Sequence, residues 1–111
     1  MSSNLPQVQA SELADDAVIL DVREQDEWDV GHAPGALHIP LGDLPERLAE
    51  LPDTDAETLP VTCRGGGRSS QAVAWLSQQG LDVANLDGGM IAWNAAGKQL
   101  VADGDAAPRV K

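Results

Sequence analysis

Short apolar runs that alternate with segments of helical periodicity constrain the fold of this chain more than any other feature. The predicted strands are 18–22, 37–39, 59–62 and 83–86, and the predicted helices are 25–30, 43–51, 69–79 and 90–96. Strands and helices that alternate in this way are typical of a parallel sheet, because each parallel connection needs a crossover. We therefore predict an α/β fold, a small parallel sheet of about five strands with helices on both faces.

Particular residues set the predicted helix ends. Gly31 is expected to close the first helix by taking a left-handed conformation, as glycine often does after a helix. The second helix begins with Asp43 or Leu44 as its N-cap and ends at Pro52. These residues predict where the chain turns back toward the sheet.

Length and charge limit the possible function classes. The 111 residues suit a single domain over 1–111, and we expect its polar segment 97–111 to be ordered only in part. The net charge of −11 argues against nucleic acid and membrane partners, because both favour a basic surface. Residues 1–60 hold 14 acidic side chains and two basic ones, whereas residues 61–111 hold four acidic and five basic. Anion binding in the second half therefore needs local positive charge.

The single cysteine indicates the compartment. One cysteine forms no intramolecular disulfide, and thiol chemistry is best preserved where the surroundings are reducing. The first residues lack the basic start and apolar stretch of a secretory signal, and no segment has the length needed to cross a bilayer. We therefore expect a cytoplasmic protein; its oligomeric state is left open.

That cysteine begins a glycine-rich segment between predicted strand 59–62 and predicted helix 69–79. The segment consists of Cys63, Arg64, Gly65, Gly66, Gly67, Arg68 and Ser69. Three glycines let the backbone curl with its amides pointing inward, and amides at a helix start favour a thiolate over a thiol. We expect a nucleophilic cysteine with a lowered pKa, and not the small buried hydrophobe that a lone cysteine often is.

The two arginines of this segment are expected to have different roles. Arg68 lies where the loop becomes helix, so its guanidinium is expected to point into the pocket. Arg64 lies next to the nucleophile and is expected to line the mouth of the pocket. The two assignments can be exchanged without changing the class of reaction. Either arrangement gives a site for a small anion.

Four ordered segments of the chain resemble the rhodaneses, the thiosulfate sulfurtransferase family. They are Leu20-Asp21-Val22-Arg23-Glu24, Gly31-His32-Ala33-Pro34-Gly35-Ala36, Cys63-Arg64-Gly65-Gly66-Gly67-Arg68-Ser69 and Gly88-Gly89-Met90-Ile91-Ala92-Trp93. The resemblance implies a small parallel sheet flanked by helices, with Cys63 as the catalytic residue and Arg64 to Ser69 as the substrate-binding loop.

The resemblance also implies a reaction. Cys63 takes the outer sulfur of thiosulfate as a persulfide, releases sulfite, and passes the sulfur to cyanide, a thiol or a protein sulfur carrier. No metal or organic cofactor is implied, because the sulfur travels covalently on the enzyme. Phosphatase and arsenate reductase relatives have one more residue in this loop, so the four residues between Cys63 and Arg68 favour sulfur transfer.

Other polar and aromatic residues have open roles. Asp21 and Arg23 either orient the loop or form a structural ion pair, and His32 either shuttles a proton or fastens a turn by hydrogen bonding. Trp75 and Trp93 are expected in the core, and no partner is predicted for His38.

A second function of another class also stays open. A catalytically idle rhodanese-like module that binds a partner protein would use the acidic first half as a docking surface. The cysteine and both arginines favour the enzyme.

Overall fold

A computed structural model describes residues 5–53 and 57–111 and shows one sheet with helices packed against it. In chain order the elements are β1 (Gln7–Val8), η1 (Ala10–Glu12), β2 (Ile19–Asp21), α1 (Gln25–Val30), β3 (Ala36–His38), η2 (Leu41–Glu50), β4 (Leu59–Thr62), α2 (Gly67–Gln78), β5 (Val83–Leu86) and α3 (Gly89–Ala95). The strands form a five-stranded sheet in the order β1-β5-β4-β2-β3, and all of its pairings are parallel. The predicted α/β fold is confirmed.

Apolar clusters cover both faces of this sheet. Alternate residues of β2 divide between them, since Leu20 belongs to the cluster under α2 and η2 whereas Ile19 belongs to the cluster under α3 and η1. This alternation follows from the strand period of two residues. Trp93 is fully buried in the second cluster, so its predicted core position is confirmed, whereas Trp75 is only partly buried and packs against the edge of the first cluster.

Strands β4 and β5 occupy the residues that the sequence predicts, whereas β1 lies outside the prediction. Both central strands are buried throughout, so their apolar runs are plain in the sequence. β1 has only two residues, one of them polar, and it pairs with β5 through Gln7 opposite Asn85. A strand of two residues is too short to show periodicity, so only its pairing with β5 identifies β1 as a strand.

Three of the predicted helices differ in detail from the structure. The one predicted at 69–79 is α2, which begins two residues earlier, at Gly67, and ends at Gln78. Gly31 has φ 171°, which is extended backbone and not left-handed. Glycine is needed there because a Cβ would lie 2.0 Å from the carbonyl oxygen of Arg109, in the returning C-terminal segment. The second helix begins at Leu41 after Pro40, not with Asp43 or Leu44 as its N-cap, and it consists of 3-10 turns interrupted at Arg47.

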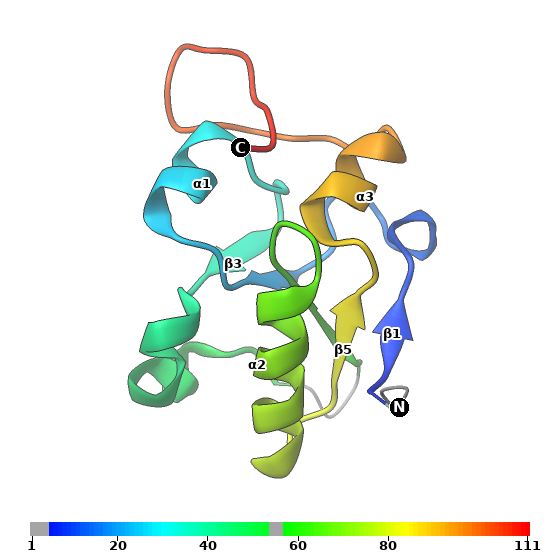
Figure 1. The fold of residues 1–111 in the computed structure, drawn as a ribbon, viewed down its shortest axis with the longest axis vertical. Coiled ribbons are helices and arrows are strands. Elements are labelled where there is room, and N and C mark those ends of the chain that lie inside the picture. The colour runs from blue at the N-terminus through cyan, green and yellow to red at the C-terminus, as the bar shows by residue number, and fades with distance from the viewer. Residues whose placement is uncertain (1–4, 54–56) are drawn as a thin grey trace.

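The segment 97–111 returns from α3 across the molecule to α1, as Figure 1 shows at the top. Val101 forms an antiparallel bridge with His32, the amide of Arg109 donates to the carbonyl of Val30 at 2.8 Å, and Val110 packs against the second cluster. These contacts bring the last residues beside the loop that follows β4. The expectation that this segment is ordered only in part stays a prediction.

Among the helices that the structure describes, none is both long and apolar enough to cross a membrane.

Candidate active site

The loop that carries Cys63 lies at the carboxyl end of β4, in the middle of the sheet. It rises between α1 and α3 and leads directly into α2 (Figure 1). The carboxyl ends of parallel strands are where α/β folds bind ligands. Because β2 and β5 flank β4, the loop is enclosed on both sides by buried strands.

The sulfur of Cys63 lies inside a ring of hydrogen-bond donors. The amide of Gly66 donates to Sγ at 3.0 Å, and the amide of Ser69 donates at 3.4 Å. The hydroxyl Oγ of Ser69 lies 3.3 Å from the same sulfur. Gly66 precedes α2 with φ 114°, a left-handed conformation that favours glycine, and this turn aims the amides inward. The inward-facing amides that the sequence predicts are therefore present.

These contacts control the protonation of the thiol. Burial is the largest single influence and raises the pKa of Cys63, but the hydrogen bonds from the Ser69 hydroxyl and from the amides of Ser69, Gly66 and Arg68 together outweigh it. The pKa of Cys63 is consequently below the usual value for a thiol. A lowered pKa makes the thiolate, which is the nucleophilic form, more abundant near neutral pH.

The carbonyls of the loop point away from the sulfur, toward α3. The amide of Met90 donates to the carbonyl of Cys63 at 2.8 Å, and the amide of Ile91 donates to that of Arg64 at 3.1 Å. Gly89 permits this approach, since a Cβ there would lie 2.5 Å from the oxygen of Cys63. With these carbonyls bonded elsewhere, the ring keeps amide hydrogens toward the sulfur.

Behind the ring, Asn85 forms a polar contact that the sequence analysis did not single out. The side-chain amide of Asn85 forms a hydrogen bond with Oγ of Ser69, and its other end lies 3.3 Å from the side-chain amide of Gln7. Asn85 is buried in the middle of β5. A polar residue within an otherwise apolar buried strand is the signal that could have identified it, because buried polar groups need partners.

Gly65 and Gly67 differ from Gly66. Both are exposed, and a Cβ at either position would meet nothing within 4 Å. Their role is therefore not conformational; the missing side chains leave the outer part of the loop open. This openness fits the prediction that they line a substrate-binding loop, which stays a prediction.

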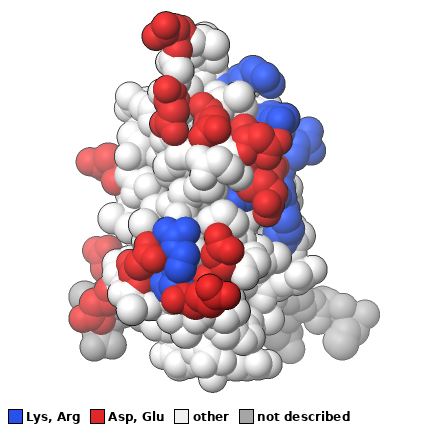
Figure 2. Space-filling view, turned by 90° about the vertical axis from the view of Figure 1, so that its left-hand side faces the viewer, with Lys and Arg blue, Asp and Glu red and all other residues white. Residues whose placement is uncertain are grey.

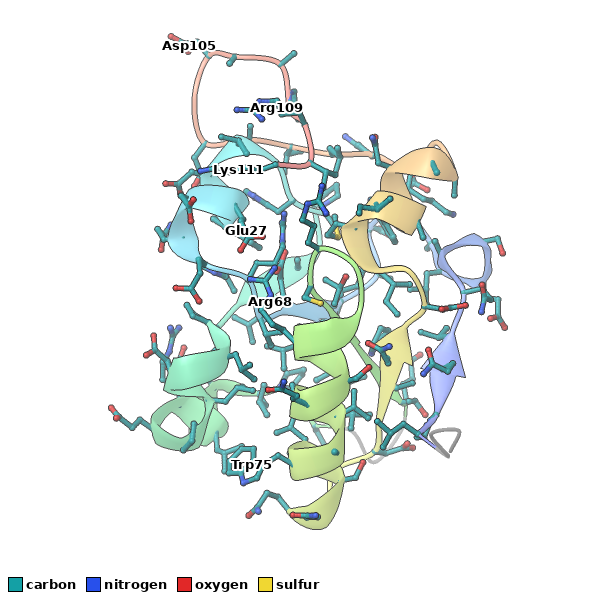
Figure 3. All side chains as sticks on the ribbon, viewed as in Figure 1. Glu27, Arg68, Trp75, Asp105, Arg109 and Lys111 are labelled. Atoms are coloured by element: carbon teal, nitrogen blue, oxygen red, sulfur yellow. The ribbon has the colours of Figure 1, made fainter. Side chains whose placement is uncertain are left out.

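Each arginine of the loop engages another part of the chain. The guanidinium of Arg68 forms two hydrogen bonds to the carboxylate of Glu27 on α1, at 2.7 and 2.9 Å, and Figure 3 shows the two side chains facing each other. This pairing, more than the opposing effect of burial, lowers the pKa of Glu27 to about 2. Nε of Arg64 donates to the main-chain oxygen of Lys111 at 2.9 Å. Neither Glu27 nor Lys111 was singled out from the sequence.

Helix α1, which carries Glu27, is fixed by a buried ion pair. Arg23 and Asp21 are both fully buried, and Nη2 of Arg23 lies 2.7 Å from the carboxylate of Asp21. Arg23 also donates to the carbonyls of Glu27 at 3.4 Å and Gly31 at 2.8 Å, at the middle and end of the helix. The structural ion pair, one of the two alternatives left open, is therefore what the structure shows.

The two histidines fasten the chain around Trp28. Nδ1 of His32 lies 2.8 Å from the carbonyl of Trp28, and the two rings stack with centroids 3.5 Å apart. His38 also stacks on Trp28, and its Nε2 lies 2.7 Å from the carbonyl of Arg23. Of the two roles considered for His32, these contacts support fastening a turn.

Comparison with known proteins shows the family of this chain. A family model described as a rhodanese-like domain matches residues 6–96. The chain belongs to the rhodanese-like family. It is similar to a sulfurtransferase of Allochromatium vinosum, with 42% identity over 79% of this chain and 81% of the relative. It is also similar to the thiosulfate sulfurtransferase GlpE of Pseudomonas putida, with 36% identity over 92% of this chain and 94% of the relative.

Solved structures of rhodanese-like proteins share the fold. A rhodanese-related protein from Thermoplasma volcanium superimposes with a TM-score of 0.76 at 31% identity, covering 86% of this chain and 97% of the other. The match to the family model ends before the segment 97–111. The contact between Arg64 and Lys111 therefore lies partly outside the region that defines the family.

Proposed function

We propose that this protein is a sulfurtransferase that takes sulfane sulfur from thiosulfate and holds it as a persulfide on Cys63. The observation that carries the proposal is the position of Sγ, which accepts hydrogen bonds from the Gly66 and Ser69 amides and has a lowered pKa. The same donors that favour a thiolate would hold the anionic terminal sulfur of a persulfide. The family and the sulfurtransferases among its relatives support this reaction class.

In the first half-reaction, the Cys63 thiolate attacks the outer sulfur of thiosulfate. A sulfur–sulfur bond forms on Cys63, and the sulfur–sulfur bond of thiosulfate breaks. The electron pair of the broken bond leaves with sulfite, so a thiolate and a dianion become a persulfide anion and a dianion. Amides fixed by the fold need no reorganisation as the charge moves to the terminal sulfur.

In the second half-reaction, a thiophilic acceptor attacks the terminal sulfur and releases the Cys63 thiolate. The acceptor is cyanide in an assay, or a thiol or protein sulfur carrier, and Arg64, Gly65 and Gly67 line its path of approach. No metal or organic cofactor takes part, because the sulfur stays covalently bound to the protein. A reducing compartment such as the cytoplasm suits a pathway that depends on one free thiol.

Cys63→Ser tests the proposal. We expect complete loss of sulfite release from thiosulfate with the fold intact, because a hydroxyl cannot carry the sulfur. Mass spectrometry of the wild-type protein after incubation with thiosulfate should show one added sulfur atom at Cys63, and none in the variant.

Circular dichroism of both proteins controls for folding. Turnover by the variant, or a folded wild-type protein that gains no sulfur, would contradict the proposal. The second of these results would favour the idle binding module instead.

A further inference from the structure

The pair formed by Arg68 and Glu27 changes the charge that the mouth of the site presents. Its two hydrogen bonds use two of the five guanidinium donors and place a full negative charge against the positive one. The side chain of Glu27 is 13% exposed and that of Arg68 is 34% exposed, so the carboxylate lies deeper. An anion that approaches Arg68 therefore meets a neutral pair and not a cation.

Glu27 is held in this position by more than Arg68. Its Oε1 also accepts the amide of Glu24 at 3.0 Å, at the start of α1, and its own carbonyl accepts a hydrogen bond from Arg23. Hydrogen bonding to Arg68 keeps the pKa of Glu27 at about 2, so the carboxylate stays charged at neutral pH. The neutralisation of Arg68 is thus a fixed property of the folded chain.

Arg64 is the other cation of the loop, and its Nε donates to the main-chain oxygen of Lys111 and not to a carboxylate. The ammonium of Lys111 pairs with Asp26, and the whole chain carries a net charge of −11. Figure 2 shows a basic side chain with acidic neighbours low on the face bearing α1 and η2, and further basic side chains along the upper right edge. The amides of Gly66 and Ser69 already donate to the Cys63 sulfur.

We propose that Glu27 determines donor specificity, because it cancels the charge of Arg68 and so disfavours donors with a second negative charge beyond the reacting sulfur. This inference rests on the proposed sulfur transfer to Cys63. Glu27 is a positioning residue in this scheme, since it acts on the donor through Arg68 and the local field.

Two donors that differ by one charge make the inference testable. Thiosulfate is a dianion, and methanethiosulfonate is a monoanion in which a methyl group replaces one charged oxygen. With either donor the Cys63 thiolate attacks the outer sulfur, the donor sulfur–sulfur bond breaks, and its electron pair leaves with sulfite or methanesulfinate. The ratio of kcat/KM for thiosulfate to kcat/KM for methanethiosulfonate isolates the effect of the second charge.

Glu27→Gln is the decisive variant, because it keeps the shape of the side chain and removes its charge. We expect the donor ratio to rise about tenfold, mainly through a lower KM for thiosulfate, given the energy of one unit charge a few ångströms away near a protein surface. Glu46→Gln, the same change at an exposed position on η2, should leave the ratio unchanged. An unchanged ratio in Glu27→Gln, or an equal fall in both kcat/KM values, would overturn the inference.

Glu27→Asp separates charge from geometry. It retains the negative charge with a shorter side chain, so the donor ratio should stay within about twofold of the wild-type value if the charge is what matters. A ratio that rises as in Glu27→Gln would show that the shape of the pair decides, and would overturn the inference.

The wild-type protein gives a test that depends on no variant. Added salt should raise kcat/KM for thiosulfate more than for methanethiosulfonate, because screening weakens the repulsion of a dianion from a site with a neutralised arginine. A fall with salt for thiosulfate would mean that an attractive positive charge dominates the mouth although Arg68 is paired, and would overturn the inference.

Sulfur loading separates this inference from the proposed function. If mass spectrometry finds no added sulfur on wild-type Cys63 with either donor, both fail. If sulfur is added with both donors but the Glu27→Gln ratio is unchanged, only the inference about Glu27 fails.

Discussion

The ring around the Cys63 sulfur and the outer rim of the loop contrast in how they present positive charge. The ring consists of the Gly66 and Ser69 amides and the Ser69 hydroxyl, all within six residues of the cysteine. The rim consists of Arg64 and Arg68, whose guanidinium groups are held by Lys111 and Glu27. The ring is local, and the rim depends on distant segments.

This difference separates two kinds of electrostatic control. Peptide dipoles are fixed by backbone geometry, and the loop carbonyls are bonded to α3, so no side-chain substitution at the rim cancels the ring. A guanidinium is a mobile charge that one carboxylate neutralises. We infer that the ring supports the sulfur chemistry and that the rim adjusts which donor is used.

Removing the buried ion pair that fixes α1, the helix that carries Glu27, should have the largest effect on stability. Arg23→Ala leaves the buried Asp21 carboxylate unpaired and removes the hydrogen bonds that hold α1. We expect the free energy of unfolding to fall by about 3–5 kcal/mol, as is usual when one partner of a buried ion pair is removed. Denaturant unfolding of the variant measures this loss.

Arg47→Ala is the matched control, since Arg47 pairs with Glu50 at the surface. Little or no change is expected there. An Arg23→Ala protein as stable as the wild type would show that α1 does not depend on the buried pair.

Distorting the ring itself should reduce turnover. Gly66→Ala places a side chain at φ 114°, where L residues are strained by about 1–2 kcal/mol, so the loop should relax and turn its amides away from Sγ. We expect kcat to fall by about tenfold, the equivalent of about 1.4 kcal/mol. Steady-state sulfite release is the measurement.

Gly42→Ala is the comparison variant, because Gly42 lies on η2, outside the loop, and a Cβ there meets nothing within 4 Å. Its kcat should remain close to that of the wild type. Equal kcat values for the two variants would refute the conformational role of Gly66.

The smallest expected change is a shift in pH dependence. Ser69→Ala removes a hydrogen bond that favours the thiolate, so the pKa of Cys63 should rise toward the usual value. Because the thiolate is the reactive form, the alkylation rate should fall at any fixed pH below that pKa. The midpoint of the pH–rate profile should shift to higher pH. The rate of Cys63 alkylation by iodoacetamide against pH gives the profile.

Ser70→Ala supplies the control for this shift. Its hydroxyl donates to the carbonyl of Gly66 at 2.7 Å, and no hydrogen bond links it to the sulfur. A profile shift in Ser70→Ala equal to that in Ser69→Ala would remove the special role assigned to Ser69.

Much of the fold follows from the sequence because the buried strands are mostly apolar. β4 and β5 are predicted residue for residue, and α1 likewise. The errors fall where long-range contacts decide the local structure. Gly31 looks like a helix terminator, but the passage of Arg109 beside it is what requires glycine.

The helix predicted at 43–51 has a different cause of error. Apolar spacing there identifies the buried Leu44, and spacing alone does not distinguish 3-10 turns from an α-helix. Pro45 lies inside the element and donates no backbone hydrogen bond, and Arg47 interrupts it. The sequence shows which side of η2 faces the core, but it does not show whether the helix is 3-10 or α.

The chain's own order of residues determined the donors of the ring around the sulfur, because a strand end, a glycine with positive φ and a helix start are all local, and α3 then bonds the loop carbonyls that face away from it. Only the tertiary structure decided the rim, since Arg68 meets Glu27 across 41 positions and Arg64 meets Lys111 across 47. The physical reason is that backbone dihedral angles depend on neighbouring residues. The pairing of charges depends on which segments the sheet order and the returning C-terminal segment bring together.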